Sequence, residues 1–212
     1  MGFISRVATT GLLALAVSGS YRLVNSRRHA EELTSPSDAS RSRPASTEQE
    51  YFSPAENLER IEMRQLRAAA ERLHGLGSPL NIAMYAFTDR VIAQALIEEA
   101  DAGTPVRVYR DGEQYDAEER DAERYRRASV TSMFRGHNNI HVRVKPASRI
   151  DLMHLKCWSD GRVLRDGSAN WSTAGLKRQD NDVRFTTDPQ EVQAFNRNFE
   201  QLWNRSTNIL VQ

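Results

Sequence analysis

NIAMYAFTDRVIAQALIEEADAGTPVRVYRD, residues 81–111, contains a complete strand–helix–strand pattern. The first seven residues form a nearly continuous apolar run, which is typical of a strand covered on both faces. Residues 105–111 predict a second strand. The intervening segment has a helical apolar face made of Val91, Ile92, Ala95, Leu96 and Ala100. Two strands joined by one helix favour a parallel pair with a right-handed crossover, so this stretch predicts an α/β fold.

Segments on both sides of this unit fit a sheet between helices. Residues 58–73 carry apolar side chains at helical spacing, and residues 112–128 predict a charged, mostly solvated helix. In residues 140–145 apolar and polar side chains alternate as in a strand. A helical stripe near the end comprises Val192, Phe195, Phe199, Leu202 and Trp203. The predicted fold class is α/β, with a mixed, largely parallel sheet flanked by helices.

The overall charge limits how the chain can bind a polyanionic partner, and the cysteine content limits which cross-links and metal sites it can form. The chain has 29 Lys and Arg against 28 Asp and Glu, a net charge of +1, so any polyanionic partner must be held by a local patch. The single cysteine, Cys157, excludes an intramolecular disulfide and leaves no cysteine cluster for structural zinc.

The first residues have the order of a signal peptide or membrane anchor: Arg6, an apolar run over residues 7–17, and then small residues. A helix between Arg6 and Arg22 would span about 22 Å, less than the roughly 30 Å of a hydrocarbon core. This favours a cleaved signal peptide, with an uncleaved anchor as the alternative. We therefore expect an exported or membrane-anchored protein, with any membrane association through residues 3–24.

Composition predicts the remaining domain boundaries. Residues 1–24 are the signal peptide or anchor, and the Ser-, Arg- and Pro-rich residues 25–54 predict a flexible tether. We expect the folded domain over residues 55–205 and a short tail over residues 206–212.

A second stretch, MHLKCWSDGRVLRDGSANWS at residues 153–172, contains several polar groups suited to chemistry. Strand alternation places His154 and Lys156 side by side on one face. The opposite, apolar face comprises Met153, Leu155 and Cys157. Each polar residue taken singly would be an ordinary surface or turn residue.

Beyond a turn at Asp160–Gly161, a second strand would bring Ser168 and Asn170 beside His154 and Lys156. An imidazole that can act as nucleophile or base, a cation and neutral donors are the groups needed for chemistry at a phosphate. Since no Asp/Glu cluster of metal-ligand type accompanies them, the sequence does not favour two-metal phosphodiesterase chemistry.

Together these residues resemble the His-x-Lys…Asp…Gly-Ser-x-Asn signature of the phospholipase D superfamily. Residues 81–116 also resemble the strand–helix–strand unit of its small single-motif members, the bacterial endonucleases and cardiolipin hydrolase-like proteins. The resemblance extends over roughly residues 55–205 and implies the α/β sandwich of that superfamily. It also implies a phosphodiesterase that needs no cofactor or metal.

The resemblance assigns a role to each matching residue. His154 would attack phosphorus and form a phosphohistidine, while Lys156, Ser168 and Asn170 would bind the non-bridging oxygens. Asp180 belongs to an acidic–Asn pair that would help to orient the site. The reaction needs a second histidine, and since the chain has one motif, this histidine would be the same residue of another copy. The resemblance thus implies a homodimer with a shared active site.

Asp160 departs from the superfamily pattern, because three residues rather than four separate it from Lys156. Losing one residue from a strand reverses the facing of the residues that follow. Either the turn begins early and absorbs the difference, or Asp160 has lost its role in the family. The normal spacing from Asp160 to Gly167 favours the early turn. An inactive phosphate-binding module is the alternative to catalysis.

The substrate is predicted less directly than the reaction. A basic rim could bind nucleic acid, and it comprises Arg124, Arg126, Arg127, Arg135, Arg143 and Lys145. Tyr125, Phe134 and Trp171 could stack on bases, although all of these residues could equally form a solvated face and core aromatics. The N-terminal apolar segment fits a phospholipid substrate. We predict a nuclease-type phosphodiesterase, with phospholipase D or cardiolipin hydrolase activity on lipid head groups as the alternative.

Overall fold

The strand–helix–strand unit predicted from residues 81–111 is present in the computed structural model, which describes residues 46–211. It consists of strand β2 (Leu80–Met84), helix α2 (Arg90–Asp101) and strand β3 (Val106–Arg110). Every residue of β2 is buried, as the apolar run predicts. The Asp89 side chain caps α2 by accepting from the backbone N–H groups of Val91 and Ile92, each at 3.0 Å. β2 and β3 pair in parallel.

The other described strands are β1 (Glu48–Phe52), β4 (Ile140–Val144), β5 (Lys156–Ser159), β6 (Leu164–Gly167), β7 (Asp182–Thr186) and β8 (Ile209–Leu210). Together with β2 and β3 they form one sheet in the order β1-β7-β6-β5-β2-β3-β4-β8. The predicted mixed sheet between helices is confirmed. Parallel pairing joins β2 to β3 and β3 to β4, while the other neighbours within this described sheet are antiparallel. The predicted largely parallel pairing is wrong for the described sheet, because β5, β6 and β7 follow one another as antiparallel neighbours and the edge strands β1 and β8 also pair antiparallel.

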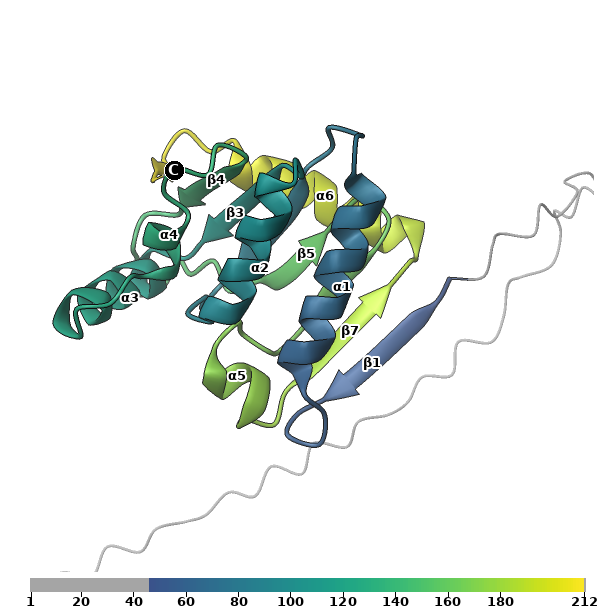
Figure 1. The fold of residues 1–212 in the computed structure, drawn as a ribbon, viewed down its shortest axis with the longest axis horizontal. Coiled ribbons are helices and arrows are strands. Elements are labelled where there is room, and N and C mark those ends of the chain that lie inside the picture. Colours follow the sequence, from purple (N-terminus) through teal and green to yellow (C-terminus); the bar gives the residue numbers. More distant parts are fainter. Residues whose placement is uncertain (1–45, 212) are drawn as a thin grey trace, which may run out of the picture. The chain divides into compact units, whose positions relative to one another are not determined.

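Helices cover both faces of the sheet (Figure 1). α1 (Leu58–Leu73) and α2 cover one face and α6 (Pro189–Trp203) covers the other (Figure 1). The remaining described helices are α3 (Gly112–Arg124), α4 (Val130–Met133) and α5 (Thr173–Lys177). Side chains along β2 alternate between the two faces, as strand geometry requires. Ile82 and Met84 pack into the core beneath α1 and α2. Ala83 packs into the second core, which is formed with the apolar stripe of α6.

Two predicted boundaries are wrong. Residues 48–52 of the predicted tether form β1, which pairs antiparallel with β7, and residues 209–210 of the predicted tail form β8 on β4. Both are edge strands with mostly exposed side chains: β1 begins with three polar residues, and β8 has only two residues, so neither shows the alternation that indicates a strand. The predictions for residues 1–45 lie outside the described residues. Within residues 46–211, no helix is both long and apolar enough to span a bilayer.

The carboxyl ends of β2 and β3 lie at the same edge of the sheet as the start of β5. β5 is antiparallel to β2, and its first residue, Lys156, pairs with Met84 at the end of β2. The carboxylate of Asp111, just after β3, accepts from the backbone N–H of Met153 at 2.8 Å. The same side chain caps α3 through the N–H of Gln114. The contacts of Asp111 therefore hold the segment that leads into β5 at this edge of the sheet. Ligands of open α/β sheets bind at the edge where the carboxyl ends of the strands lie.

Candidate active site

His154 and Lys156 lie together at this edge, on the same side of the strand as the alternation predicts. The Lys156 Nζ lies 2.9 Å from the carbonyl oxygen of His154 and 3.2 Å from its ring Nε2. Lys156 is buried, whereas His154 is exposed. The opposite face is apolar, because Met153, Leu155 and Cys157 pack into the core beneath α6. An accessible imidazole thus stands beside a largely enclosed ammonium group.

Tyr85 and Gln114 also belong to this cluster, although the sequence did not indicate them. The ring of Tyr85 packs edge-to-face on that of His154, with centroids 4.4 Å apart, and the Lys156 Nζ lies 4.9 Å from the Tyr85 centroid. The Gln114 Nε2 donates to the Tyr85 hydroxyl at 3.1 Å. In the sequence Tyr85 is part of an apolar run. Its place immediately after β2, where parallel strands end, was the available signal.

Burial lowers the pKa of Lys156 below its ordinary value. The neighbouring Cys157 thiol opposes this shift, and the positive charge of Arg165 adds to it. Little solvent therefore competes for the ammonium group, and an anionic ligand would restore its preference for the charged form. A group in this state is suited to neutralise a phosphate.

Ser168 is held by Asp182, the first residue of β7. The Ser168 hydroxyl donates to the Asp182 Oδ1 at 2.5 Å, and its backbone N–H donates to the same oxygen at 3.1 Å. In return, the Asp182 N–H donates to the Ser168 oxygen at 3.0 Å. The hydroxyl is oriented by a carboxylate that the sequence pattern did not reveal, and a bound phosphate must compete with that carboxylate for the hydroxyl hydrogen.

Asn170 is tied to the segment that follows β2. Its side-chain oxygen accepts from the backbone N–H of Ala86 at 3.3 Å, and among the described residues its amide nitrogen has no partner. Lys156 pairs with Met84, and the Asn170 side chain bonds to Ala86, two residues further along the chain. The structure therefore ties Lys156 and Asn170 to neighbouring positions at the end of β2, and His154 lies beside Lys156.

Asp160 and Asp180 lie outside this group. Asp160 begins the turn after β5, about 13 Å along the strand from Lys156. Its carboxylate accepts from the N–H groups of Arg162 and Val163, at 2.8 and 2.7 Å, and pairs with Arg72 at 2.6 Å. β5 ends at Ser159, so the turn begins at Asp160. Asp180 is exposed and takes part in no hydrogen bond or ion pair with the residues described.

The predicted stacking surface is only partly present. Phe134 and Trp171 are fully buried, so of the two alternatives the structure bears out core aromatics for them and not base-stacking groups. Tyr125 is 61% exposed, with the guanidinium carbons of Arg124 and Arg127 at 6.0 and 5.6 Å from its ring centroid. Among the described side chains, no group of three or more His, Cys, Asp or Glu is placed to hold a metal.

Comparisons with known proteins identify the family and the fold of the chain. Residues 69–203 match the family model described as "Cardiolipin synthase, PLD-like domain". The mitochondrial cardiolipin hydrolase of Chlamydomonas reinhardtii is 25% identical over 126 residues, 59% of this chain and 51% of the relative. The protein of the same name from Danio rerio is 24% identical over 136 residues, 64% of this chain and 56% of the relative. The chain thus spans about half the length of these relatives.

Solved structures share the fold. NucT from Helicobacter pylori superposes with a TM-score of 0.63 at 18% identity, covering 78% of this chain and 99% of NucT. Nuc from Salmonella typhimurium, a phospholipase D family member, gives 0.57 at 16% identity and covers 78% and 98% of the two chains. At these identities the likeness concerns the fold.

Proposed function

Because the chain belongs to the family of PLD-like domains, we propose that it hydrolyses phosphodiesters without a metal, with His154 as nucleophile. The observation that carries the proposal is the convergence of an exposed imidazole, an enclosed ammonium group and a free amide donor at residues 84–86. These groups are the three kinds of contact that a phosphate needs: a nucleophile, a cation and a neutral donor.

In the proposed first step, a ring nitrogen of His154 bonds to phosphorus and the bond from phosphorus to one ester oxygen breaks. That oxygen takes a proton and leaves as an alcohol. In the second step, water bonds to the phosphorus of the phosphohistidine, and the bond to His154 breaks. Lys156, Ser168 and Asn170 stabilise the charge on the non-bridging oxygens in both steps. Splitting the displacement into two steps makes each easier.

A second imidazole must donate and then accept the proton, and we propose that a second copy supplies it. The other described histidines lie away from the site. His74 ends α1, just before β2 begins, while His137 and His141 lie at the start of β4. These positions are at the amino ends of the parallel strands, opposite His154. In a two-fold dimer each site would contain His154 from both chains.

Among phosphodiesters, the proposed substrate is a phospholipid. Ile150 and Leu152 are 88% and 37% exposed, and they precede His154 by four and two residues, at most about 14 and 7 Å along the chain. Exposed apolar side chains beside a site suit a lipid surface. The relatives named cardiolipin hydrolase agree with this class. The predicted apolar segment at residues 3–24 would keep the domain near a bilayer.

Nucleic acid, which the sequence favoured, is the second candidate. The exposed ring of Tyr125 between two arginines is the observation that supports it. However, burial of Phe134 and Trp171 removes the other proposed stacking groups.

Both substrates are tested in one assay of the full chain in EDTA. Vesicles of cardiolipin or phosphatidylcholine and single-stranded DNA and RNA are compared, with His154→Ala as the control. We expect cleavage of phospholipid that requires His154 and no added metal. Cleavage of nucleic acid alone would select the second candidate, and activity only after metal addition would contradict the phosphohistidine route. Binding without turnover in every arm would indicate an inactive phosphate-binding module.

The lowered pKa of Lys156 predicts the alkaline side of the pH profile. As the pH rises through this pKa the ammonium group loses its proton, so kcat/KM should fall at a pH below the ordinary lysine pKa of about 10.4. The profile of kcat should fall at higher pH, because a bound anion favours charged Lys156. Lys156→Arg should remove this limb, since guanidinium stays protonated. An unchanged limb in that variant would show that another group causes it.

A further inference from the structure

A buried ion pair lies beneath the hairpin that carries the candidate site. Arg165 on β6 and Glu62 on α1 are both fully buried, with the Arg165 Nε 2.6 Å from the Glu62 Oε1. The other Glu62 oxygen accepts from the Trp158 indole N–H at 3.0 Å. A buried pair of charges is tolerated only where its remaining polar atoms are also bonded. The other partners of the Arg165 guanidinium therefore matter.

Those partners are two backbone carbonyls that belong to the site. One terminal nitrogen of Arg165 donates to the carbonyl of Lys156, and the other donates to that of Ala169 at 3.0 Å. Lys156 provides the ammonium group, and Ala169 stands between Ser168 and Asn170. One guanidinium group thus contacts both halves of the phosphate site from below.

The contact occurs where the backbone ladder between the two arms ends. β5 and β6 pair at Ser159–Leu164 and Trp158–Arg165, and the register goes no further toward the site. Beyond the Trp158–Arg165 pair, the planar guanidinium group of Arg165 connects the two arms in place of backbone hydrogen bonds. Two donors in a fixed plane can span two carbonyls, whereas the single ammonium nitrogen of a lysine has no such fork.

We propose that Arg165, held by Glu62, is a positioning residue that sets the separation between Lys156 and the Ser168–Asn170 segment. Because its side chain is inaccessible, it acts through these backbones and not on the substrate. Displacement of a catalytic group by about 1 Å can cost roughly 100-fold in rate. The kinetic part of this inference rests on the proposed phosphodiesterase function.

The first test is Arg165→Lys, which keeps the charge and removes the fork. At a temperature where near-ultraviolet circular dichroism shows a folded protein, we expect kcat on bis(4-nitrophenyl) phosphate to fall about 10- to 100-fold. The alkaline limb assigned to Lys156 should stay in place, because the nearby positive charge is kept. This combination separates lost alignment from a changed charge.

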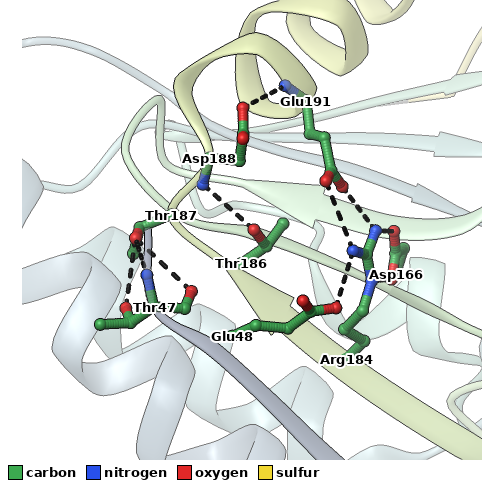
Figure 2. A network of polar contacts seen from close by, with 8 residues as sticks. All are labelled: Thr47, Glu48, Asp166, Arg184, Thr186, Thr187, Asp188 and Glu191. Carbon is green, nitrogen blue, oxygen red and sulfur yellow. Dashed lines mark hydrogen bonds and ion pairs between the residues drawn. The ribbon is translucent and has the colours of Figure 1, made fainter. Parts of the chain in front are cut away.

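Arg184→Lys is the matched control. Figure 2 shows Arg184 on β7, where it binds Asp166, Glu191 and Glu48. Among the described residues, its side-chain hydrogen bonds and ion pairs are with these three acids and with no candidate site residue. The same substitution there also breaks a network of ion pairs, so it should reduce stability while leaving kcat within about threefold. An Arg165→Lys variant no less active than Arg184→Lys would overturn the proposal.

A second, double variant tests the proposal if Arg165→Lys does not fold. Glu62→Gln with Arg165→Met leaves no unpaired charge and keeps an oxygen for the Trp158 N–H. Replacing a buried pair in this way is often neutral for folding. We expect the same loss of kcat, and an alkaline limb at higher pH, because the Arg165 charge that lowers the pKa of Lys156 is gone. Wild-type kcat in this double variant would overturn the proposal.

Binding of inorganic phosphate separates this inference from the proposed function. If the wild-type chain cleaves no diester, the proposed function fails, and calorimetric titration with phosphate still tests Arg165. We then expect at least tenfold weaker binding by Arg165→Lys and unchanged binding by Arg184→Lys. Equal binding by all three proteins would overturn the positioning role, and a wild-type chain that neither cleaves diesters nor binds phosphate would overturn both proposals.

Discussion

His154→Ala should lower phosphodiester hydrolysis by about 10⁴-fold or more, because it removes the atom that bonds to phosphorus. Fold stability should change little, since His154 is exposed and its described side-chain contacts are with Tyr85 and Lys156. Turnover of bis(4-nitrophenyl) phosphate and thermal unfolding, measured on the same preparation, check both parts. A variant that unfolds normally and keeps a tenth of the wild-type rate would exclude His154 as the nucleophile.

Mixing experiments extend this prediction to the proposed dimer. If each site needs His154 from both chains, only wild-type pairs are active in a randomly exchanged mixture with His154→Ala. An equal mixture should then have about a quarter of the activity of the all-wild-type protein, whereas independent sites would give half. Light scattering on the active wild-type protein provides the control, and an active monomer would contradict the shared site.

The central fold could be predicted because its signals are local. The apolar run at β2, the Asp89 cap and the stripe of α6 each indicate an element within a few residues. By contrast, β1 and β8 are stabilised by pairing with strands far away in the sequence, and their own side chains are mostly exposed. In β1 and β8 the local pattern is too weak or too short to indicate a strand.

The same distinction holds for the site. Alternation was enough to place His154 beside Lys156, because the two residues are two positions apart in the segment that leads into β5. Tyr85 directly follows β2 and Asp182 begins β7, and only the sheet order brings them to the motif. Arg165 was hidden for another reason. In the sequence Arg165 is one of many charged residues, and nothing near it indicates that it is buried. It is buried because the fold brings its side chain on β6 to Glu62 on α1, with which it forms an ion pair.

Asp160 shows how a complete motif can mislead. It matched the pattern by residue type, but its carboxylate is fully used by the N–H groups of a turn and by Arg72. The described structure therefore separates the hairpin into two functional parts. Its turn end is a structural unit, and its open end carries the groups proposed for catalysis.

Gly167→Ala should cost about 3–5 kcal/mol of unfolding free energy and disrupt Ser168 with it. Gly167 has a φ of 132°, and a Cβ there would lie 2.5 Å from the Asp182 carbonyl oxygen. An alanine must therefore adopt a strained backbone and also push β7 away. Since a domain of this kind is stabilised by about 5–15 kcal/mol in total, a large part of the stability would be lost. Urea unfolding monitored by tryptophan fluorescence measures the change.

Gly161→Ala is the matched control at the turn end of the same hairpin. Its φ is 86°, but no heavy atom lies within 4 Å of the position that a Cβ would take, so this substitution adds backbone strain without a clash. We expect a cost of about 1–2 kcal/mol and nearly unchanged activity. The difference between the two variants isolates the contact with Asp182, the residue that holds the Ser168 hydroxyl. Equal losses of unfolding free energy in the two variants would mean that β7 moves away from the added Cβ at no cost. The orientation of Ser168 by Asp182 could then not depend on the close packing of Gly167 against Asp182.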